Sequence, residues 1–239
     1  MRYGYRIKAE RKNNSAKSLT KEYGSHRRVR IMYSDKKDNR EIKTNPIDSM
    51  DIIKDEVYRR LLWNSESNRM GWGGHCGIVD GRATLDKVEW LRGELETLTP
   101  KRILEIGTNY GSFSWLLYTT LAEFRLETCD IVESSREEIE WINRHYGKDW
   151  VKFYNVSSEA FLEGRFGADL VWMDGNHQTE WVKKEILWIE ATQAPIVWID
   201  DWNWAELREG VEGSGTRYKL ERTSPNGDVA IMRLDGVSQ

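Results

Sequence analysis

Three aspartates at the ends of two apolar runs form the most chemically suggestive pattern in the sequence. The run Leu170-Val-Trp-Met ends in Asp174, and the run Ile196-Val-Trp-Ile ends in Asp200 and Asp201. If the two runs are neighbouring strands, about 4.8 Å apart, the three carboxylates meet at one point. Such carboxylates repel one another unless a proton or a cation intervenes. The oxygen ligands predict Mg²⁺, with Mn²⁺ or Ca²⁺ as alternatives; otherwise one or two of them cap helices or face solvent.

A histidine and two tryptophans adjoin these aspartates. His177 is a candidate general base, because imidazole titrates near neutral pH, and its alternative role is to anchor its loop by hydrogen bonding. Asp174 is a second candidate base if it keeps a free oxygen. We expect Trp202 and Trp204 to project over a pocket for the substrate. For Trp204, packing under the next helix is an equally good explanation. His75, in a glycine-rich segment, is a weaker candidate base.

A glycine motif lies earlier, in residues 103–111, which read Ile-Leu-Glu-Ile-Gly-Thr-Asn-Tyr-Gly. The apolar run, the two glycines and the helical pattern that follows predict a strand, a tight turn and a helix N-terminus, which together hold a nucleotide-like ligand. The spacing is not Gly-x-Gly-x-x-Gly, so the loop suits a ligand without a pyrophosphate. The predicted cofactor-binding residues of this motif are Glu105, Gly107, Thr108, Asn109 and Gly111.

Two further strand ends carry polar residues. Asp130 lies about 25 residues beyond Glu105, where a carboxylate can accept hydrogen bonds from ribose hydroxyls, and Glu133 is the substitute if the strand runs longer. Ser157 and Ser158 follow the next strand and can border an adenine ring; capping the next helix is an equally good explanation.

The elements that must position these residues alternate along the chain. The hydrophobic pattern predicts a helix from Ser49, a second from Thr84 to the residues before Pro100, and then strands alternating with helices. The last two strands flank the segment Ser224-Pro-Asn-Gly-Asp, which predicts a hairpin. The expected fold is α/β, a Rossmann-like doubly wound seven-stranded sheet, mostly parallel with a C-terminal antiparallel hairpin. The predicted strands are 102–106, 126–131, 150–154, 169–173, 195–199, 217–222 and 229–234, and the helices between them are 111–123, 134–146, 157–163 and 179–191.

The glycine motif and the terminal hairpin resemble those of class I S-adenosylmethionine-dependent methyltransferases. The set Asp174-Gly-x-His177 with Asp200-Asp201 resembles the metal-dependent O-methyltransferases of the macrocin O-methyltransferase and cephalosporin-hydroxylase-like group, over about residues 84–235. In that family three equivalent aspartates hold Mg²⁺, which binds two vicinal substrate oxygens. The resemblance therefore implies Asp174, Asp200 and Asp201 as metal ligands, S-adenosylmethionine as cofactor, and methyl transfer to a small-molecule hydroxyl such as that of a sugar or glycan.

Charge divides the chain. Up to Lys43 there are 14 Lys or Arg against 5 Asp or Glu, a net charge of +9. Because the whole chain has a net charge of −3, the residues after Lys43 have a net charge of −12. We expect a basic, flexible arm over residues 1–45, a helical cap with a glycine-rich loop (71–82) over 46–100, and the methyltransferase core over 101–239. Such an arm can also bind nucleic acid.

Several classes are disfavoured. No apolar stretch reaches the roughly 18–20 residues that span a membrane, and the polar N-terminus is unlike a secretory signal. Cys76 and Cys129 form no CxxC pair, so we expect reduced cysteines and a cytoplasmic location. Two alternatives remain open, a nucleic-acid methyltransferase that uses the basic arm and a non-catalytic ligand-binding protein of the same fold. The oligomeric state, including a homo-oligomer, also stays open.

Overall fold

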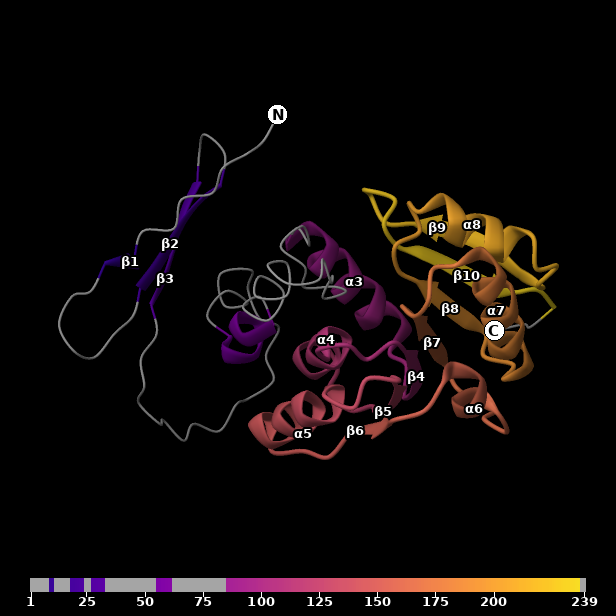
Figure 1. The fold of residues 1–239 in the computed structure, drawn as a ribbon, viewed down its shortest axis with the longest axis horizontal. Coiled ribbons are helices and arrows are strands. Elements are labelled where there is room, and N and C mark those ends of the chain that lie inside the picture. Colours follow the sequence, from indigo (N-terminus) through magenta and orange to yellow (C-terminus); the bar gives the residue numbers. More distant parts are fainter. Residues whose placement is uncertain (1–8, 11–17, 24–26, 33–54, 62–84, 237–239) are drawn as a thin grey trace. The chain divides into compact units, whose positions relative to one another are not determined.

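A seven-stranded sheet with the order β6-β5-β4-β7-β8-β10-β9 organises the chain in a computed structural model (Figure 1). The structure describes residues 9–10, 18–23, 27–32, 55–61 and 85–236. The parallel strands are β4 (Arg102–Ile106), β5 (Arg125–Cys129), β6 (Val151–Tyr154), β7 (Leu170–Met173) and β8 (Ile196–Ile199). Strand β10 (Ala230–Leu234) runs antiparallel between β8 and β9 (Tyr218–Thr223). The predicted fold class, with its terminal hairpin, is confirmed.

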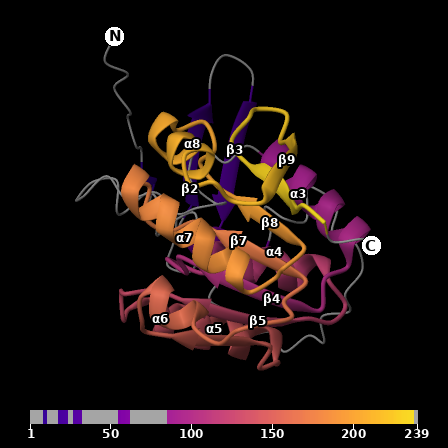
Figure 2. The same cartoon turned by 90° about the vertical axis from the view of Figure 1, so that its right-hand side faces the viewer.

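Helices cover both faces of this sheet (Figures 1 and 2). One face packs against α3 (Leu85–Leu98), α4 (Ser112–Thr120) and α5 (Ser135–Tyr146), and the other against α6 (Ser158–Leu162), α7 (Thr179–Ala191) and α8 (Ala205–Glu212). Strands β7 and β8 are buried on both faces because alternate residues enter the two cores. That explains why both strands read as continuous apolar runs and why their first polar residues come where they leave the sheet.

The cap contributes a short helix over residues 56–61. Val57 and Leu61 are buried in the same core as α3 and α4. Asp55 begins this helix by accepting a hydrogen bond from the Tyr58 N–H (2.9 Å), and it also accepts one from the Trp115 indole (3.2 Å). The predicted helix from Ser49 is therefore present in its C-terminal part, and its earlier residues and Thr84 lie outside the described residues. None of the helices that the structure describes is long and apolar enough to cross a membrane.

Residues Met1–Lys43 form a separate compact unit. Its described strands, β1 (Ala9–Glu10), β2 (Ser18–Tyr23) and β3 (Arg27–Met32), pair antiparallel in the order β1-β2-β3, with Ser18 opposite Met32 and Tyr23 opposite Arg27. These strands were not predicted from the sequence, because charged residues interrupt the apolar alternation that marks a strand. The boundary after Lys43 lies close to the predicted one, and the flexibility of the arm stays a prediction.

Candidate active site

The glycine loop after β4 packs directly onto the end of β7. Gly107 has a φ of +88°, and a Cβ placed on it would lie 1.9 Å from the carbonyl oxygen of Asp174. No side chain fits there, so the glycine joins the predicted cofactor loop to the predicted metal ligand. At Gly111, a Cβ would lie 2.7 Å from Ile142 Cδ1 of α5, so the glycine lets the start of α4 pack closely against α5.

Backbone hydrogen bonds fix the same loop to β5. The Asp130 carboxylate accepts hydrogen bonds from the Asn109 N–H (2.8 Å) and the Val132 N–H (2.9 Å), and the Gly107 N–H donates to the Cys129 carbonyl (3.0 Å). Asn109 itself has a left-handed φ of +46°. Asp130 follows the last residue of β5, so the substitute Glu133, which pairs with Arg136 at the surface, is not required at this position. The carboxylate predicted to bind a ribose therefore also holds the shape of the loop.

A buried carboxyl group lies beneath the loop. Glu105 is 1% exposed, and burial raises the pKa of its carboxyl to about 8, although a hydrogen bond with Thr128 opposes this. Its Oε2 has no hydrogen-bond partner among the described residues. The Thr108 and Thr128 hydroxyls are 2.5 Å apart in the same layer. Glu105 is therefore largely protonated at neutral pH and leaves one oxygen for a ligand.

The two serines after β6 act in helix α6. The Ser157 hydroxyl caps the helix by accepting a hydrogen bond from the Ala160 N–H (3.4 Å), as the capping alternative predicted. Ser158 is buried and hydrogen-bonds to Glu185. Neither contact favours the adenine-bordering role, and that role stays a prediction.

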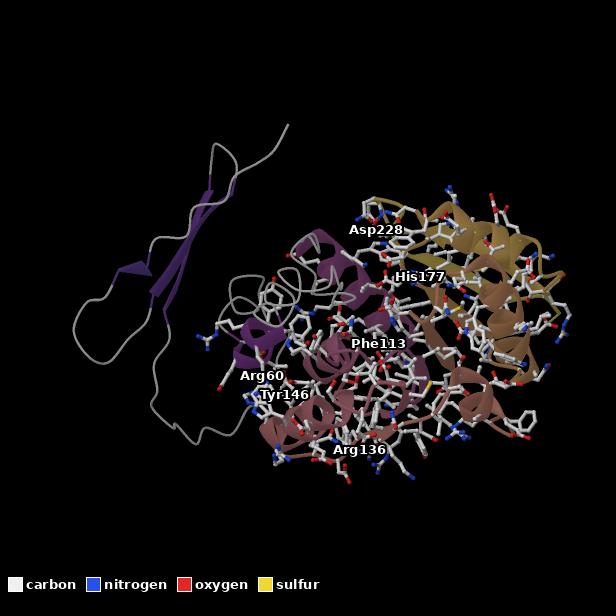
Figure 3. The ribbon with its side chains drawn as sticks, viewed as in Figure 1. Arg60, Phe113, Arg136, Tyr146, His177 and Asp228 are labelled. Atoms are coloured by element: carbon white, nitrogen blue, oxygen red, sulfur yellow. The ribbon has the colours of Figure 1, made fainter. Side chains whose placement is uncertain are left out.

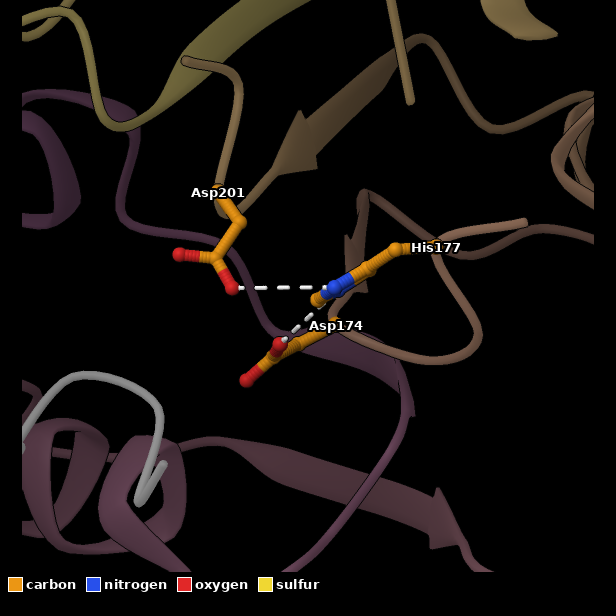
Figure 4. A group of neighbouring side chains, drawn as sticks. All are labelled: Asp174, His177 and Asp201. Atoms are coloured by element: carbon orange, nitrogen blue, oxygen red, sulfur yellow. Dashed lines mark ion pairs between the residues drawn. The ribbon is translucent and has the colours of Figure 1, made fainter. Parts of the chain in front are cut away.

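Asp174, His177 and Asp201 form one group at the ends of β7 and β8 (Figure 4). His177 lies between the two carboxylates, with Nε2 3.9 Å from an oxygen of Asp174 and Nδ1 3.8 Å from an oxygen of Asp201. One potential ligand atom from each residue lies within 4.8 Å of the others. The His177 Nε2 is buried and has no hydrogen-bond partner among the described residues. We call this set the Asp174–His177–Asp201 group.

Electrostatics make the group short of positive charge. Burial raises the pKa of Asp174 well above its ordinary value, and the neighbouring charges of Asp200 and Asp201 raise it further. Lys87 opposes that shift. Carboxylates held this way take up a proton or attract a cation.

Asp200 does not belong to this group. Its Oδ1 accepts a hydrogen bond of 2.6 Å from the Lys87 ammonium, in an ion pair whose side chains are 1% and 6% exposed. Asp200 and Asp201 are consecutive, and Asp201 has a left-handed φ of +52°, so their carboxylates have different partners. The predicted ligand set of Asp174, Asp200 and Asp201 is thus only partly brought together by the structure, and His177 takes the third place.

Lys87 was missed in the sequence analysis, although a signal existed. It lies four residues before Leu91 and eight before Leu95, on the side of α3 that the pattern assigned to the core. A lysine on the buried side of an amphipathic helix needs a partner. Burial lowers the pKa of Lys87, but the charges of Asp200, Asp174 and Asp228 outweigh this effect and raise it. Asp228 lies in the same part of the domain as His177 (Figure 3).

The tryptophans after β8 separate. Trp202 is buried in the core beside α7 and α8, so its expected place over an acceptor pocket is wrong. Trp204 is 42% exposed, and its ring stands edge-on to the His177 imidazole with centroids 4.9 Å apart. Only Trp204 therefore borders the group. His75 and the loop 71–82 lie outside the described residues.

Comparisons with known proteins agree with this geometry. Residues 104–202 match a family model described as "Methyltransferase domain". No curated protein matches the sequence. Three solved structures of low sequence identity share the fold of this chain. They are the SAH-bound methyltransferase PaMTH1 of Podospora anserina (17% identity, TM-score 0.58, covering 76% of this chain and 88% of that one), an O-methyltransferase of Bacillus cereus in complex with SAH (14%, 0.56, 75% and 91%), and TomG of Streptomyces achromogenes in complex with SAM (16%, 0.57, 82% and 100%).

The matched segment runs from within β4 to the residues after β8 and contains the cofactor loop and the Asp174–His177–Asp201 group, whereas Lys87, Trp204 and Asp228 lie outside it. Residues 104–202 therefore resemble a methyltransferase domain, and the sheet that carries them shares its fold with these three solved structures.

Proposed function

We propose that the protein transfers the methyl group of S-adenosylmethionine to a hydroxyl of a small molecule, and that a divalent cation, Mg²⁺ in the first place, assists at the Asp174–His177–Asp201 group. The observation that carries the proposal is the contact between Gly107 and Asp174. It brings the cofactor loop and the acidic group to one point of the sheet edge. Similar structures that hold SAM or SAH, and are named O-methyltransferases, support this choice.

The cofactor side has groups for each part of the ligand. Asp130 would accept hydrogen bonds from the ribose hydroxyls, and Asn109 and Gly107 form the turn beside it. Ile131 and Val156, at the ends of β5 and β6, are 78% and 38% exposed and offer apolar contacts for an adenine ring. Glu105 has an unpartnered oxygen that could accept a hydrogen bond from the cofactor.

The acceptor side fits a small divalent cation. Asp174 and Asp201 would hold it, since Mg²⁺ is commonly bound by one or two carboxylates together with water and substrate oxygens. The unrelieved charge of Asp174 and the orphaned His177 nitrogen are the features that a cation or a polar substrate would satisfy. When bound, the cation would lower the pKa of the acceptor hydroxyl and orient it.

We assign proton removal to His177. Its Nε2 takes the proton from the acceptor hydroxyl, and the oxygen attacks the methyl carbon of the cofactor. The new O–C bond forms as the C–S bond breaks. The electron pair of the C–S bond stays on sulfur, so that the sulfonium becomes a thioether. The edge of Trp204 shields the imidazole from water on one side. Asp174 is the alternative base, and the turnover rates of the His177→Ala and Asp174→Asn variants distinguish the two assignments.

Charge favours a small acceptor over nucleic acid. Asp174, Asp200, Asp201 and Asp228 all belong to the surroundings of the site, and a phosphate backbone would be repelled there. A neutral diol or phenol avoids that repulsion. The basic unit Met1–Lys43 stays without an assigned partner.

The test uses the full chain with S-adenosylmethionine carrying a labelled methyl group and a panel of diols, phenols and sugars. We expect SAH, but not NAD, to raise the melting temperature, because only a ligand that binds the native state stabilises it. Turnover should be lost with EDTA and return with Mg²⁺. Asp174→Asn and Asp201→Asn should lose turnover, whereas Asp235→Asn, at an exposed turn, should retain it. Full activity after EDTA treatment would remove the cation from the proposal.

A further inference from the structure

A buried ion pair joins the cap to the site. Lys87 belongs to α3 and Asp200 follows β8, 113 residues later, and their charged atoms are 2.6 Å apart. Both side chains are almost fully buried. Burying a charged group removes it from water at a large cost in free energy, and a pair of apolar residues of similar size often gives a fold that is at least as stable. Stability alone therefore does not explain the pair, and we looked for its role in the neighbouring site.

The neighbours of Lys87 supply that explanation. Besides Asp200, the ammonium feels the charges of Asp174 and Asp228, and Asp174 in turn lies in the field of Asp200 and Asp201. Lys87 is the positive side chain whose charge opposes the rise in the pKa of Asp174. It is the internal cation of an otherwise acidic site.

The pair also decides which oxygens remain for a metal. With one oxygen of Asp200 held by Lys87, the carboxylates of the Asp174–His177–Asp201 group that can hold an ion are those of Asp174 and Asp201. The charges of Lys87 and Asp200 cancel, which leaves two carboxylates to balance one divalent ion. Without Lys87 there would be three.

We propose that Lys87 is a positioning residue that keeps Asp200 out of the metal ligands and sets the cation affinity of the site. The inference rests on the proposed function, because it concerns the cation assigned there. It turns a three-aspartate site, as the sequence motif predicts, into a site with two aspartates and a neutral lysine–aspartate pair.

The experiment measures Mn²⁺ binding to the full chain with saturating SAH, from the electron paramagnetic resonance signal of the free ion. Lys87→Met should bind Mn²⁺ about 10-fold more tightly than wild type, because Asp200 becomes available. Asp200→Asn should weaken binding by about 10-fold, because an unpaired ammonium is left beside Asp174. The double variant should return to within about 3-fold of wild type, since both charges are gone. Lys101→Met, which removes the lysine of an exposed pair with Glu123, is the control and should change nothing.

Two results would overturn the inference. If the double variant bound Mn²⁺ as weakly as Asp200→Asn, Asp200 would be a metal ligand. If Lys87→Met only lowered the melting temperature and left Mn²⁺ affinity unchanged, the pair would be purely structural. Should Lys87→Met not fold, the Asp200→Asn and double variants still decide the first question. Absence of Mn²⁺ binding in wild type, with SAH binding intact, would contradict the cation in the proposed function and this inference with it. Normal Mn²⁺ binding with either of the first two results would contradict the inference alone.

Discussion

The cofactor loop and the Asp174–His177–Asp201 group lie at the same sheet edge but are built in different ways. Backbone conformation and backbone hydrogen bonds shape the loop, through Gly107, Asn109 and the Asp130 carboxylate. Side chains from distant segments shape the acidic group, with Lys87 reaching Asp200 from a helix before the sheet begins. A local motif can thus specify the first region, while the second depends on which charges the fold brings together.

The two regions meet at Gly107, and a side chain there should disrupt both. In Gly107→Ala the new methyl group would lie 1.9 Å from the Asp174 carbonyl oxygen, at a φ of +88°. We expect a loss of more than about 3 kcal/mol in the free energy of unfolding, together with loss of SAH binding. Denaturant unfolding and calorimetry measure these. Gly147→Ala is the control: φ is +64° but no atom lies within 4 Å of the new Cβ, so it should cost only about 1 kcal/mol.

His177 should separate the regions. His177→Ala should lower the turnover number roughly 10²-fold to 10⁴-fold by removing the base. SAH affinity should stay unchanged, because the imidazole lies against Asp174, Asp201 and Trp204 and not against the cofactor loop in the part of the chain that the structure describes. Single-turnover rates and SAH titration test this. A retained rate in His177→Ala with a lost rate in Asp174→Asn would transfer the role of base to Asp174.

Glu105 tests the cofactor side through pH. Its pKa is raised to about 8, so between about pH 5 and 8 the folded state keeps a proton that the unfolded chain has released. This contribution to stability is fully present below the unfolded pKa and is lost as pH rises through about 8. Wild type should lose about 1.4 kcal/mol per pH unit from this group over that range, and Glu105→Gln, which resembles the protonated acid, should not. Equal pH slopes in urea unfolding of the two proteins would refute the assignment.

Trp204 tests the acceptor side with the smallest expected effect. Trp204→Ala should raise the KM for the acceptor about 3-fold to 10-fold, because an exposed aromatic contact is lost, and should leave SAH affinity unchanged. Leu220→Ala removes a similarly exposed apolar side chain from β9 and should leave KM unchanged. An unaltered KM in Trp204→Ala would place the acceptor elsewhere.

Most of the fold followed from sequence periodicity. The strands from residue 102 onward and helices α4 to α7 were predicted within a few residues, because strands buried on both faces and amphipathic helices leave distinct patterns. The short helix α8 was given no predicted bounds. The strands of Met1–Lys43 were not, since charged residues interrupt their alternation. At the site, the polar residues at the strand ends were found because parallel strands bring their carboxyl ends to one edge. Trp202 was predicted to lie over the site, but the backbone turns at Asp201, which has a left-handed φ, and the Trp202 side chain lies in the core.

The sequence by itself determined that a strand, a glycine turn and a helix follow one another over residues 102–120, because these depend on contacts between residues close in the chain. The tertiary structure decided how the carboxylates are divided. Asp200 is bound by Lys87, while His177 joins Asp174 and Asp201. Partners far apart in the chain are chosen by packing, and no spacing in the sequence records which lysine will be buried against which aspartate.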